Sequence, residues 1–318
     1  MRIARLAADN QRTQGPERRA WYRRYNPEHL RAVAELVEEG LGLGGPACTR
    51  QMVILGAGAC TEIPLERLAR ASAHFLLVDL DVAGMAQARD ELPAALRSRV
   101  DLLQADLTGG VSAALAAELR ATPFADLNLL DQGRGMAPVE AAADCLERCP
   151  VPDPPQLAGL QPGGYNLVIS DFIMTQLYSL PLLDVIDTLT AYAPAVADLR
   201  ETLPRYRDAA NAFRRRVTLA HLALLRTLLA PRGVALLLSD RVGELLPPKA
   251  GPHVRDPIER LETLPESALV MPDDLEREFA LEAPMRVWRW LLSAPDAERP
   301  GRRYDVFGVL MRPQAVSA

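Results

Sequence analysis

Short apolar runs alternate with longer segments of helical spacing between about residues 50 and 107. The runs are MVIL, HFLLVD and VDLLQADL, and the segments between them include IPLERLARA and MAQARDELPAALRSR. A short apolar run bounded by glycine or acid is typical of a strand buried on both faces. Strands that alternate with helices at this spacing pair in parallel through right-handed crossovers. The pattern predicts a doubly wound α/β sheet.

The same alternation resumes in the second half of the chain. Apolar runs at 165–170 and 234–240 predict two more strands, with a long helix from about 205 to 230 between them. The tail adds two apolar segments, MRVWRWLL and YDVFGVLM, separated by a charged, turn-rich stretch, which is typical of an antiparallel pair. We therefore expect a mostly parallel sheet with an antiparallel C-terminal strand.

Helical segments without strand partners precede and interrupt this alternation. Residues 17–40 carry aromatic and aliphatic positions at helical spacing, which predicts an N-terminal helical lid over 1–45. The remaining domain, 46–318, is expected to contain helical cap insertions at about 108–164 and 172–204. The second insertion is expected to be broken at three prolines, Pro181, Pro194 and Pro204.

Composition and charge narrow the class of partner. Hydrophobic residues make up 49% and charged residues 24%, as in ordinary globular chains, and the net charge of −5 gives no global attraction to phosphate backbones. We expect a small-molecule substrate and no nucleic acid. The sequence carries no apolar run of membrane-spanning length and no secretory signal, so a cytoplasmic protein without a membrane partner is expected. The cysteines lack zinc-site spacing, so no metal is expected; they are Cys48, Cys60, Cys145 and Cys149.

A glycine turn follows the first expected strand. Gly56 and Gly58 let the backbone turn tightly and approach a ligand closely. A dinucleotide fold has a third glycine to seat a diphosphate, but here Thr61 and Glu62 follow. A carboxylate there repels a diphosphate and suits an ammonium group. The alternative for Glu62 is a stabilising acid in the first turn of a helix.

Acids also follow the second and third expected strands. Asp79 ends FLLVD, where a carboxylate can accept both hydroxyl groups of a ribose, and Asp81 is expected to cap the next helix. Asp106 ends LLQAD and is a candidate for the adenine amino group, with the backbone N–H of Leu107 beside it. Carboxyl ends of parallel strands meet at one edge, so we expect these groups to share one crevice.

Four motifs in order, VILGAGACTEIPL, FLLVDLD, QADL and YNLVISDFIMTQL, resemble the series of class I S-adenosylmethionine-dependent methyltransferases. The resemblance covers about residues 50–310 and implies a Rossmann-like fold with S-adenosyl-L-methionine as cofactor. The sequence departs from the family by lacking an acid just before Gly56 and by having Cys60 in place of a third glycine. The expected cofactor-binding residues are Gly56, Ala57, Gly58, Cys60, Glu62, Asp79, Leu80, Asp106, Leu107, Ser170 and Phe172.

Methyl transfer is an in-line displacement, so alignment of the acceptor matters more than a catalytic base. Asp171 is the candidate for orienting or deprotonating the acceptor, and helix capping is its alternative role. Tyr178 is the second expected catalytic residue, and Tyr22, Tyr25 and Gln176 are expected to bind substrate.

Three functions are consistent with these residues. The first is methyl transfer to a small or natural-product-like acceptor. The second is transfer or cyclisation of the aminocarboxypropyl arm of S-adenosylmethionine by the same fold. The third is a cofactor-binding protein without turnover, or a dinucleotide-dependent oxidoreductase. Neither the acceptor nor the oligomeric state follows from the sequence.

Overall fold

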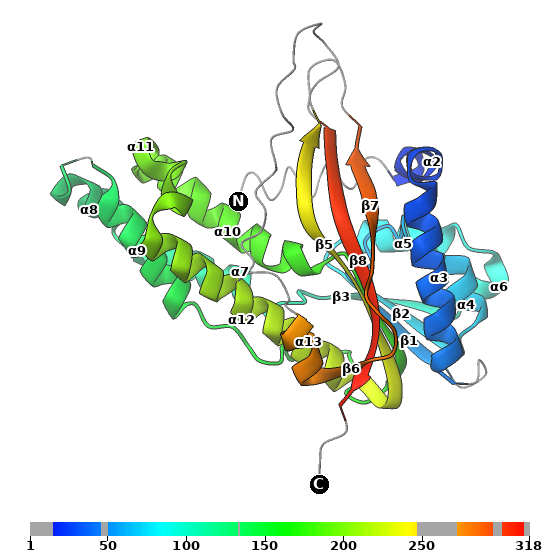
Figure 1. Ribbon diagram of the computed structural model, residues 1–318. Helices are drawn as coiled ribbons and strands as arrows, with labels where there is room; N and C mark the ends of the chain where they lie inside the picture. Colours follow the sequence, from blue (N-terminus) through cyan, green and yellow to red (C-terminus); the bar gives the residue numbers. More distant parts are fainter. Residues whose placement is uncertain (1–14, 46–49, 133, 247–271, 295–300, 315–318) are drawn as a thin grey trace, which may run out of the picture. The chain divides into compact units, whose positions relative to one another are not determined.

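The computed structural model describes residues 15–45, 50–132, 134–246, 272–294 and 301–314. The chain divides into two compact units, a sheet unit and a helical unit (Figure 1). The sheet unit takes in Asp9–Ala105, Ala158–Ile173 and Leu225–Ala318, and the helical unit takes in Asp106–Leu157 and Met174–Leu224. No helix among the described residues is both long and apolar enough to cross a membrane.

One mixed sheet organises the sheet unit, in the strand order β3-β2-β1-β4-β5-β8-β6, with β7 also paired to β8. Strands β1 to β5 pair in parallel, and β8 runs antiparallel to β5, β6 and β7. The predicted fold class is therefore confirmed. The strands are β1 (Gln51–Leu55), β2 (His74–Asp79), β3 (Val100–Gln104), β4 (Tyr165–Asp171), β5 (Leu229–Leu246), β6 (Phe279–Leu281), β7 (Arg286–Ser293) and β8 (Gly301–Pro313).

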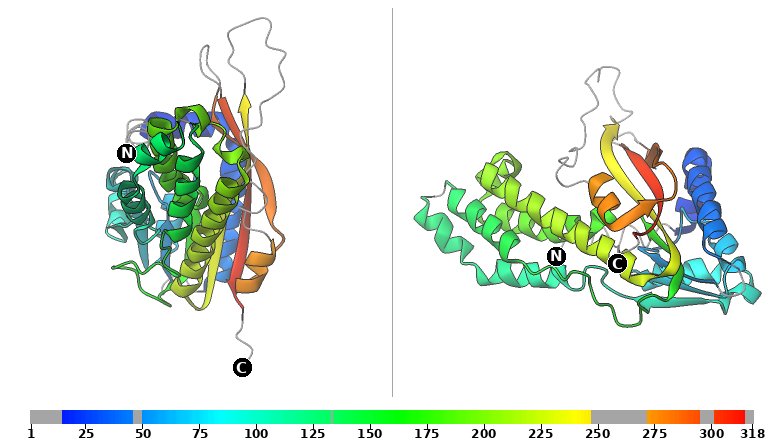
Figure 2. Two further views of the ribbon diagram at one scale, coloured as in Figure 1. Left: turned by 90° about the vertical axis from the view of Figure 1, so that its left-hand side faces the viewer. Right: turned by 60° about the horizontal axis from the view of Figure 1, so that its bottom comes forward.

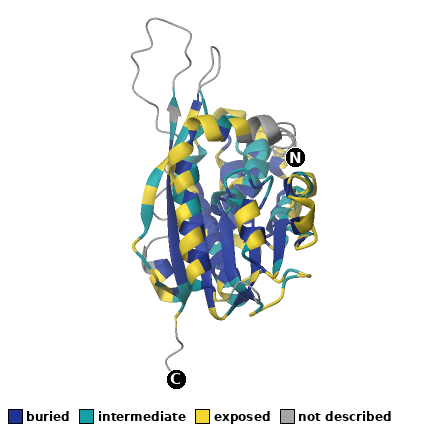
Figure 3. Cartoon of the chain, turned by 90° about the vertical axis from the view of Figure 1, so that its right-hand side faces the viewer, coloured by how far each residue is buried: buried dark blue, intermediate teal, exposed yellow. Residues whose placement is uncertain are grey.

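Both faces of the central strands are buried, as their continuous apolar runs require (Figure 3). Met52 and Ile54 of β1 belong to a cluster with α3, α4 and α5, which cover one face of the sheet, while the alternate Val53 and Leu55 are equally buried. The helices of this unit are α2 (Gly15–Tyr25), α3 (Pro27–Leu43), α4 (Leu65–Arg70), α5 (Val82–Asp90), α6 (Ala94–Arg97) and α13 (Pro272–Glu278).

Helix α3 is part of the layer that covers the sheet. Val33, Leu36 and Val37 lie on one face of α3, and all are buried in the cluster that contains β1 and β2. Residues 1–14 of the expected lid lie outside the described residues. The lid function of 1–45 stays a prediction.

The helical unit brings the two expected insertions together. Helices α7, α9 and α10 contact one another, and Figure 2 shows the helices of this unit packed side by side. This unit extends to Leu224, beyond the expected end of the second insertion. Its elements are α7 (Val111–Ala121), α8 (Phe124–Leu130), α9 (Met136–Arg148), α10 (Met174–Tyr192), α11 (Pro194–Ala197), the short 3₁₀ turn Arg200–Thr202, and α12 (Pro204–Leu228), which continues into the sheet unit.

Prolines act differently from the expectation at two places. Pro181 lies inside α10 instead of breaking it, because buried Leu177, Leu182 and Val185 anchor the helix on both sides of the missing hydrogen bond. Pro93 ends the preceding helix, which divides the single expected helix over MAQARDELPAALRSR into α5 and α6.

Candidate functional site

The glycine turn after β1 combines two different glycines. Gly56 has φ 78° and Gly58 has φ 45°, both in the left-handed region that glycine favours. A Cβ on Gly56 would lie 2.5 Å from the Cβ of Ile173, whereas one on Gly58 would meet only Asp79 Oδ2, at 4.0 Å. Gly56 thus permits close packing against the segment after β4, and Gly58 leaves open space beside Asp79.

The backbone of the turn returns to a positive φ at Cys60, beyond Gly58. Backbone N–H groups of Gly56 and Ala57 donate to the carbonyl of Val78, which ties the turn to β2. Cys60 is buried and has φ 48°, although it stands where related motifs have glycine. Helix α4 begins only at Leu65, seven positions after Gly58.

Asp79 closes β2 and holds the glycine turn. Its Oδ2 accepts the N–H of Gly58 at 2.9 Å, and its Oδ1 accepts the N–H of Asp81 at 2.8 Å. Burial raises the pKa of Asp79, and the backbone hydrogen bonds oppose that shift. Asp81 caps α5 by accepting the N–H of Gly84, so the prediction that Asp81 is the helix cap is confirmed. Leu80 is about half exposed, and the ribose role of Asp79 stays a prediction.

Asp171 is a buried carboxylate at the end of β4. It is 6% exposed, and its Oδ1 has no hydrogen-bond partner among the described residues. Burial raises its pKa well above the ordinary value, and the negative charges of Glu62 and Asp79 raise it further. Glu62 and Asp79 therefore create a negative region that acts on Asp171 near the carboxyl ends of β1, β2 and β4.

Glu62 lies before α4, not within it. The first-turn acid of α4 is Glu66, so the alternative interpretation of Glu62 as a helix-stabilising acid is wrong. The hydroxyl of Thr61 donates to Glu62. Among the described residues, no group of three His, Cys, Asp or Glu side chains is arranged to hold a metal ion.

Phe172 follows Asp171 with φ 48° and packs into an aromatic cluster that the sequence did not reveal. Its ring centroid lies 5.3 Å from that of His29 and 4.9 Å from that of Trp290. His29 Nδ1 accepts from Trp288 Nε1 at 2.9 Å, while its Nε2 has no partner among the described residues. The only sequence signal for His29 is its place on the buried stripe of α3.

The joint between α2 and α3 is fixed to β7. The side-chain amide of Asn26 donates to the carbonyl of Leu291 and accepts its N–H, both at 2.8 Å. Tyr22 is fully buried, with its ring 6.3 Å from that of Trp290, whereas Tyr25 is 45% exposed. Of the two tyrosines expected to bind substrate, only Tyr25 offers a ring to solvent.

Four expected site residues lie in the helical unit: Asp106, Leu107, Gln176 and Tyr178. The prediction that β3 reaches Asp106 is wrong, because β3 ends at Gln104 and the Asp106 carboxylate accepts from Thr108 and Gly110 ahead of α7. Tyr178 is 2% exposed within α10. Ser170 is buried in β4 of the sheet unit. The site roles of these residues stay predictions.

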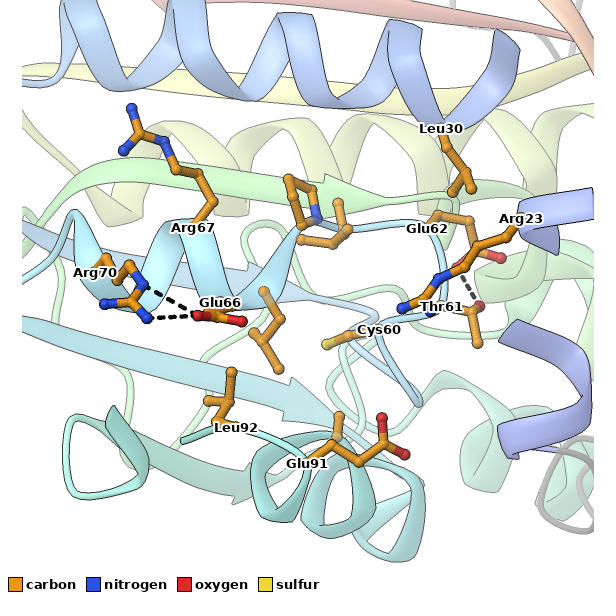
Figure 4. Close-up of a pocket in the computed structure, with 14 residues that line it drawn as sticks. Arg23, Leu30, Cys60, Thr61, Glu62, Glu66, Arg67, Arg70, Glu91 and Leu92 are labelled. Atoms are coloured by element: carbon orange, nitrogen blue, oxygen red, sulfur yellow. Dashed lines mark hydrogen bonds and ion pairs between the residues drawn. The ribbon is translucent and has the colours of Figure 1, made fainter. Parts of the chain in front are cut away.

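A cavity of about 590 Å³ lies beside the glycine turn, within the sheet unit (Figure 4). It is lined by Glu62 but by neither Gly58 nor Asp79, so it adjoins the carboxylate group on one side only. Arg23, Thr61 and Glu62 all line it, and Figure 4 shows the three on the same side of the view. The sequence did not predict this cavity, because Arg23 and residues 60–67 meet only in the fold.

The aromatic cluster predicts a pH effect on stability. Burial lowers the pKa of His29 from 6.5 to about 3. Below pH 6.5 the unfolded chain binds a proton that the folded chain does not, so stability falls as the pH falls from about 6.5 toward 3. We expect His29→Gln, which keeps an acceptor for Trp288, to remove about 2 kcal/mol of the stability loss between pH 8 and pH 5. Urea unfolding at several pH values measures this.

His221 is also buried, and its pKa is lowered to about 4, so it adds to the loss of stability at low pH. This contribution is the same in the wild type and in His29→Gln, so the difference between the two proteins reports on His29. Equal pH slopes for the wild type and His29→Gln would mean that the pKa of His29 is the same in the folded and unfolded chains, which contradicts the lowered pKa.

Strands β2 and β3 are added on one side of β1, and the parallel strands β4 and β5 on the other side. This switch in strand order, with the glycine turn after β1, defines a doubly wound α/β protein of the kind that binds ligands beyond the carboxyl ends of its strands. No family model matches the sequence, and no curated protein matches it.

Solved structures similar to this chain include the DhpI–SAH complex, with 12% identity, coverage of 96% of this chain and 94% of that chain, and a TM-score of 0.40. A SAM-dependent methyltransferase from Aquifex aeolicus has 11% identity, 87% coverage of both chains and a TM-score of 0.35. A TehB-like SAM-dependent methyltransferase from Corynebacterium glutamicum has 10% identity, 94% and 100% coverage and a TM-score of 0.35. Likeness at this level carries no information about function.

Proposed function

We propose that this chain is an S-adenosylmethionine-dependent methyltransferase acting on a small molecule or natural-product-like acceptor. The observation that carries the proposal is the buried Asp171 carboxylate, with an unpartnered oxygen, close enough to Glu62 and Asp79 for their charges to raise its pKa. S-adenosylmethionine carries a sulfonium and an ammonium group, whereas a dinucleotide carries a negative diphosphate. A negative region favours the first ligand and repels the second.

The residues of the sheet unit fit this cofactor. Gly58 leaves space where a side chain would otherwise project beside Asp79. The Asp79 carboxylate accepts backbone N–H groups, among them those of Gly58 and Asp81, and a carboxylate has four lone-pair sites in all, so it can also accept a ribose hydroxyl. Glu62 can hold an ammonium group. Bound S-adenosylmethionine supplies a methyl group already activated by the sulfonium.

Asp171 has the properties of a group that orients an acceptor or takes its proton. A buried carboxyl with a raised pKa exchanges protons closer to neutral pH than an ordinary aspartate does. The unpartnered Oδ1 is available to accept a proton or a hydrogen bond. The surrounding burial excludes water from this oxygen.

The raised pKa of Asp171 predicts pH-dependent cofactor binding. A cation binds best to the ionised carboxylate, so affinity falls as the pH falls through the pKa of Asp171, by up to about tenfold per pH unit. We expect Asp171→Asn to bind S-adenosylmethionine more weakly than the wild type does above the raised pKa, and its affinity to depend less on pH. The ligand's own titration is common to both proteins. Parallel profiles would show that Asp171 does not meet the cation.

Calorimetry with S-adenosylmethionine and NAD tests the cofactor assignment. We expect binding of S-adenosylmethionine and none of NAD, and the reverse result would overturn the proposal. Product analysis then tests the reaction with candidate acceptors. S-adenosylhomocysteine supports methyl transfer, whereas methylthioadenosine would show that the aminocarboxypropyl arm is used instead.

A further inference from the structure

The cavity beside the glycine turn has an apolar wall and a charged rim. Apolar surface is supplied by Leu30 of α3, Ile63 before α4, Leu65 at the start of α4 and Leu92 after α5. Its volume of about 590 Å³ lies in the range of small-molecule sites. A ligand of moderate size with an apolar body therefore fits this space.

Two of the three arginines that line the cavity form ion pairs with glutamates. Arg70 bonds to Glu66 at 2.6 Å, and Arg67 bonds to Glu38, so neither arginine is left for a ligand. Arg23 lines the same cavity and forms no ion pair with any other residue that the structure describes. It is thus the lining cation available for an anionic group.

Arg23 and Glu62 both line the cavity, and in Figure 4 both are seen on the right, away from Arg67 and Arg70. Arginine binds a carboxylate through two parallel hydrogen bonds, and a carboxylate binds an ammonium group. A ligand that carries both a carboxylate and an ammonium group, with an apolar side chain for Leu65 and Leu92, matches this lining. An α-amino acid has that chemistry.

We propose that this cavity binds the head group and apolar side chain of an α-amino acid, with Arg23 on the carboxylate and Glu62 on the ammonium group. Two sources carry this chemistry. One is the methionine arm of S-adenosylmethionine, which rests on the proposed function, and the other is a free amino acid that serves as acceptor.

Arg23→Met tests the proposal, with Arg31→Met as the matched control because Arg31 is exposed on the neighbouring α3 and does not line the cavity. Calorimetry measures the binding of three ligands. They are S-adenosylhomocysteine, methylthioadenosine, which lacks the amino acid arm, and L-leucine, which is added to protein saturated with S-adenosylhomocysteine. If the cofactor arm occupies the cavity, Arg23→Met raises the Kd of S-adenosylhomocysteine about 10- to 100-fold and leaves the Kd of methylthioadenosine unchanged.

If a free amino acid occupies the cavity, the wild type binds L-leucine and Arg23→Met loses that binding, while S-adenosylhomocysteine is unaffected. The proposal is overturned if Arg23→Met alters neither ligand, if it weakens methylthioadenosine as much as S-adenosylhomocysteine, or if Arg31→Met has the same effect. If the wild type binds neither adenosyl ligand, the proposed function is contradicted. L-leucine is then titrated into the protein without those ligands, and binding that Arg23→Met abolishes supports the proposal for the cavity, whereas no binding overturns it.

Discussion

Asp79→Ala is expected to weaken binding of S-adenosylmethionine by about 1 to 3 kcal/mol, which is roughly 5- to 150-fold in Kd. Alanine removes the carboxylate that would accept the ribose hydroxyls, and it also releases the N–H of Gly58 from its 2.9 Å hydrogen bond. Both effects lower affinity, because the glycine turn loses the group that fixes its position. Calorimetric titration measures the change.

Asp81→Ala is the matched control for that titration. Asp81 lies two residues further on and caps α5 through the N–H of Gly84. Loss of the cap lowers the free energy of unfolding by about 1 kcal/mol and leaves the Kd nearly unchanged. Equal Kd values for Asp79→Ala and wild type, or a larger loss in Asp81→Ala, would remove Asp79 from the cofactor site.

Gly56→Ala is expected to lower the free energy of unfolding by roughly 2 to 5 kcal/mol. An alanine at φ 78° costs about 1 to 2 kcal/mol, and its Cβ would lie 2.5 Å from the Cβ of Ile173, which adds an overpacking cost of about 1 to 3 kcal/mol. Few single substitutions have larger effects. Urea unfolding with intrinsic tryptophan fluorescence measures the loss.

Gly58→Ala provides the contrast on the same turn. Its Cβ would meet only Asp79 Oδ2 at 4.0 Å, so we expect just the backbone cost of about 1 to 2 kcal/mol in stability. The same Cβ enters the space proposed for the cofactor and should weaken S-adenosylmethionine binding at least tenfold. If Gly58→Ala binds like wild type, the open space beside Asp79 is not the cofactor site.

The parallel strands could be predicted from the sequence because each buried strand is a continuous apolar run, whereas their order in the sheet could not. HFLLVD becomes β2 with Asp79 at its end, and Asp81 becomes the helix cap, as expected from the local pattern. The end of β3 was predicted wrongly. Asp106 binds the backbone ahead of α7 and lies beyond the end of β3, a contact that apolar periodicity does not encode.

Contacts between distant segments could not be predicted from a single sequence. His29 meets Trp288 across 259 positions, and Asn26 meets Leu291 across 265. Both pairs depend on β7 lying against α3, which no local motif specifies. Glu62 was identified as a candidate from its chemistry, but its charge interaction with Asp171 required the fold. Burial of Asp171 likewise depends on the surrounding elements.

The most direct test is a crystal structure of the protein with S-adenosylhomocysteine. We expect density for the adenosyl group above Gly58, with its ribose hydroxyls within hydrogen-bond distance of the Asp79 carboxylate and its sulfur toward Asp171. Density for the ligand elsewhere on the chain, with Asp79 still bonded only to the N–H groups of Gly58 and Asp81, would contradict the proposed site.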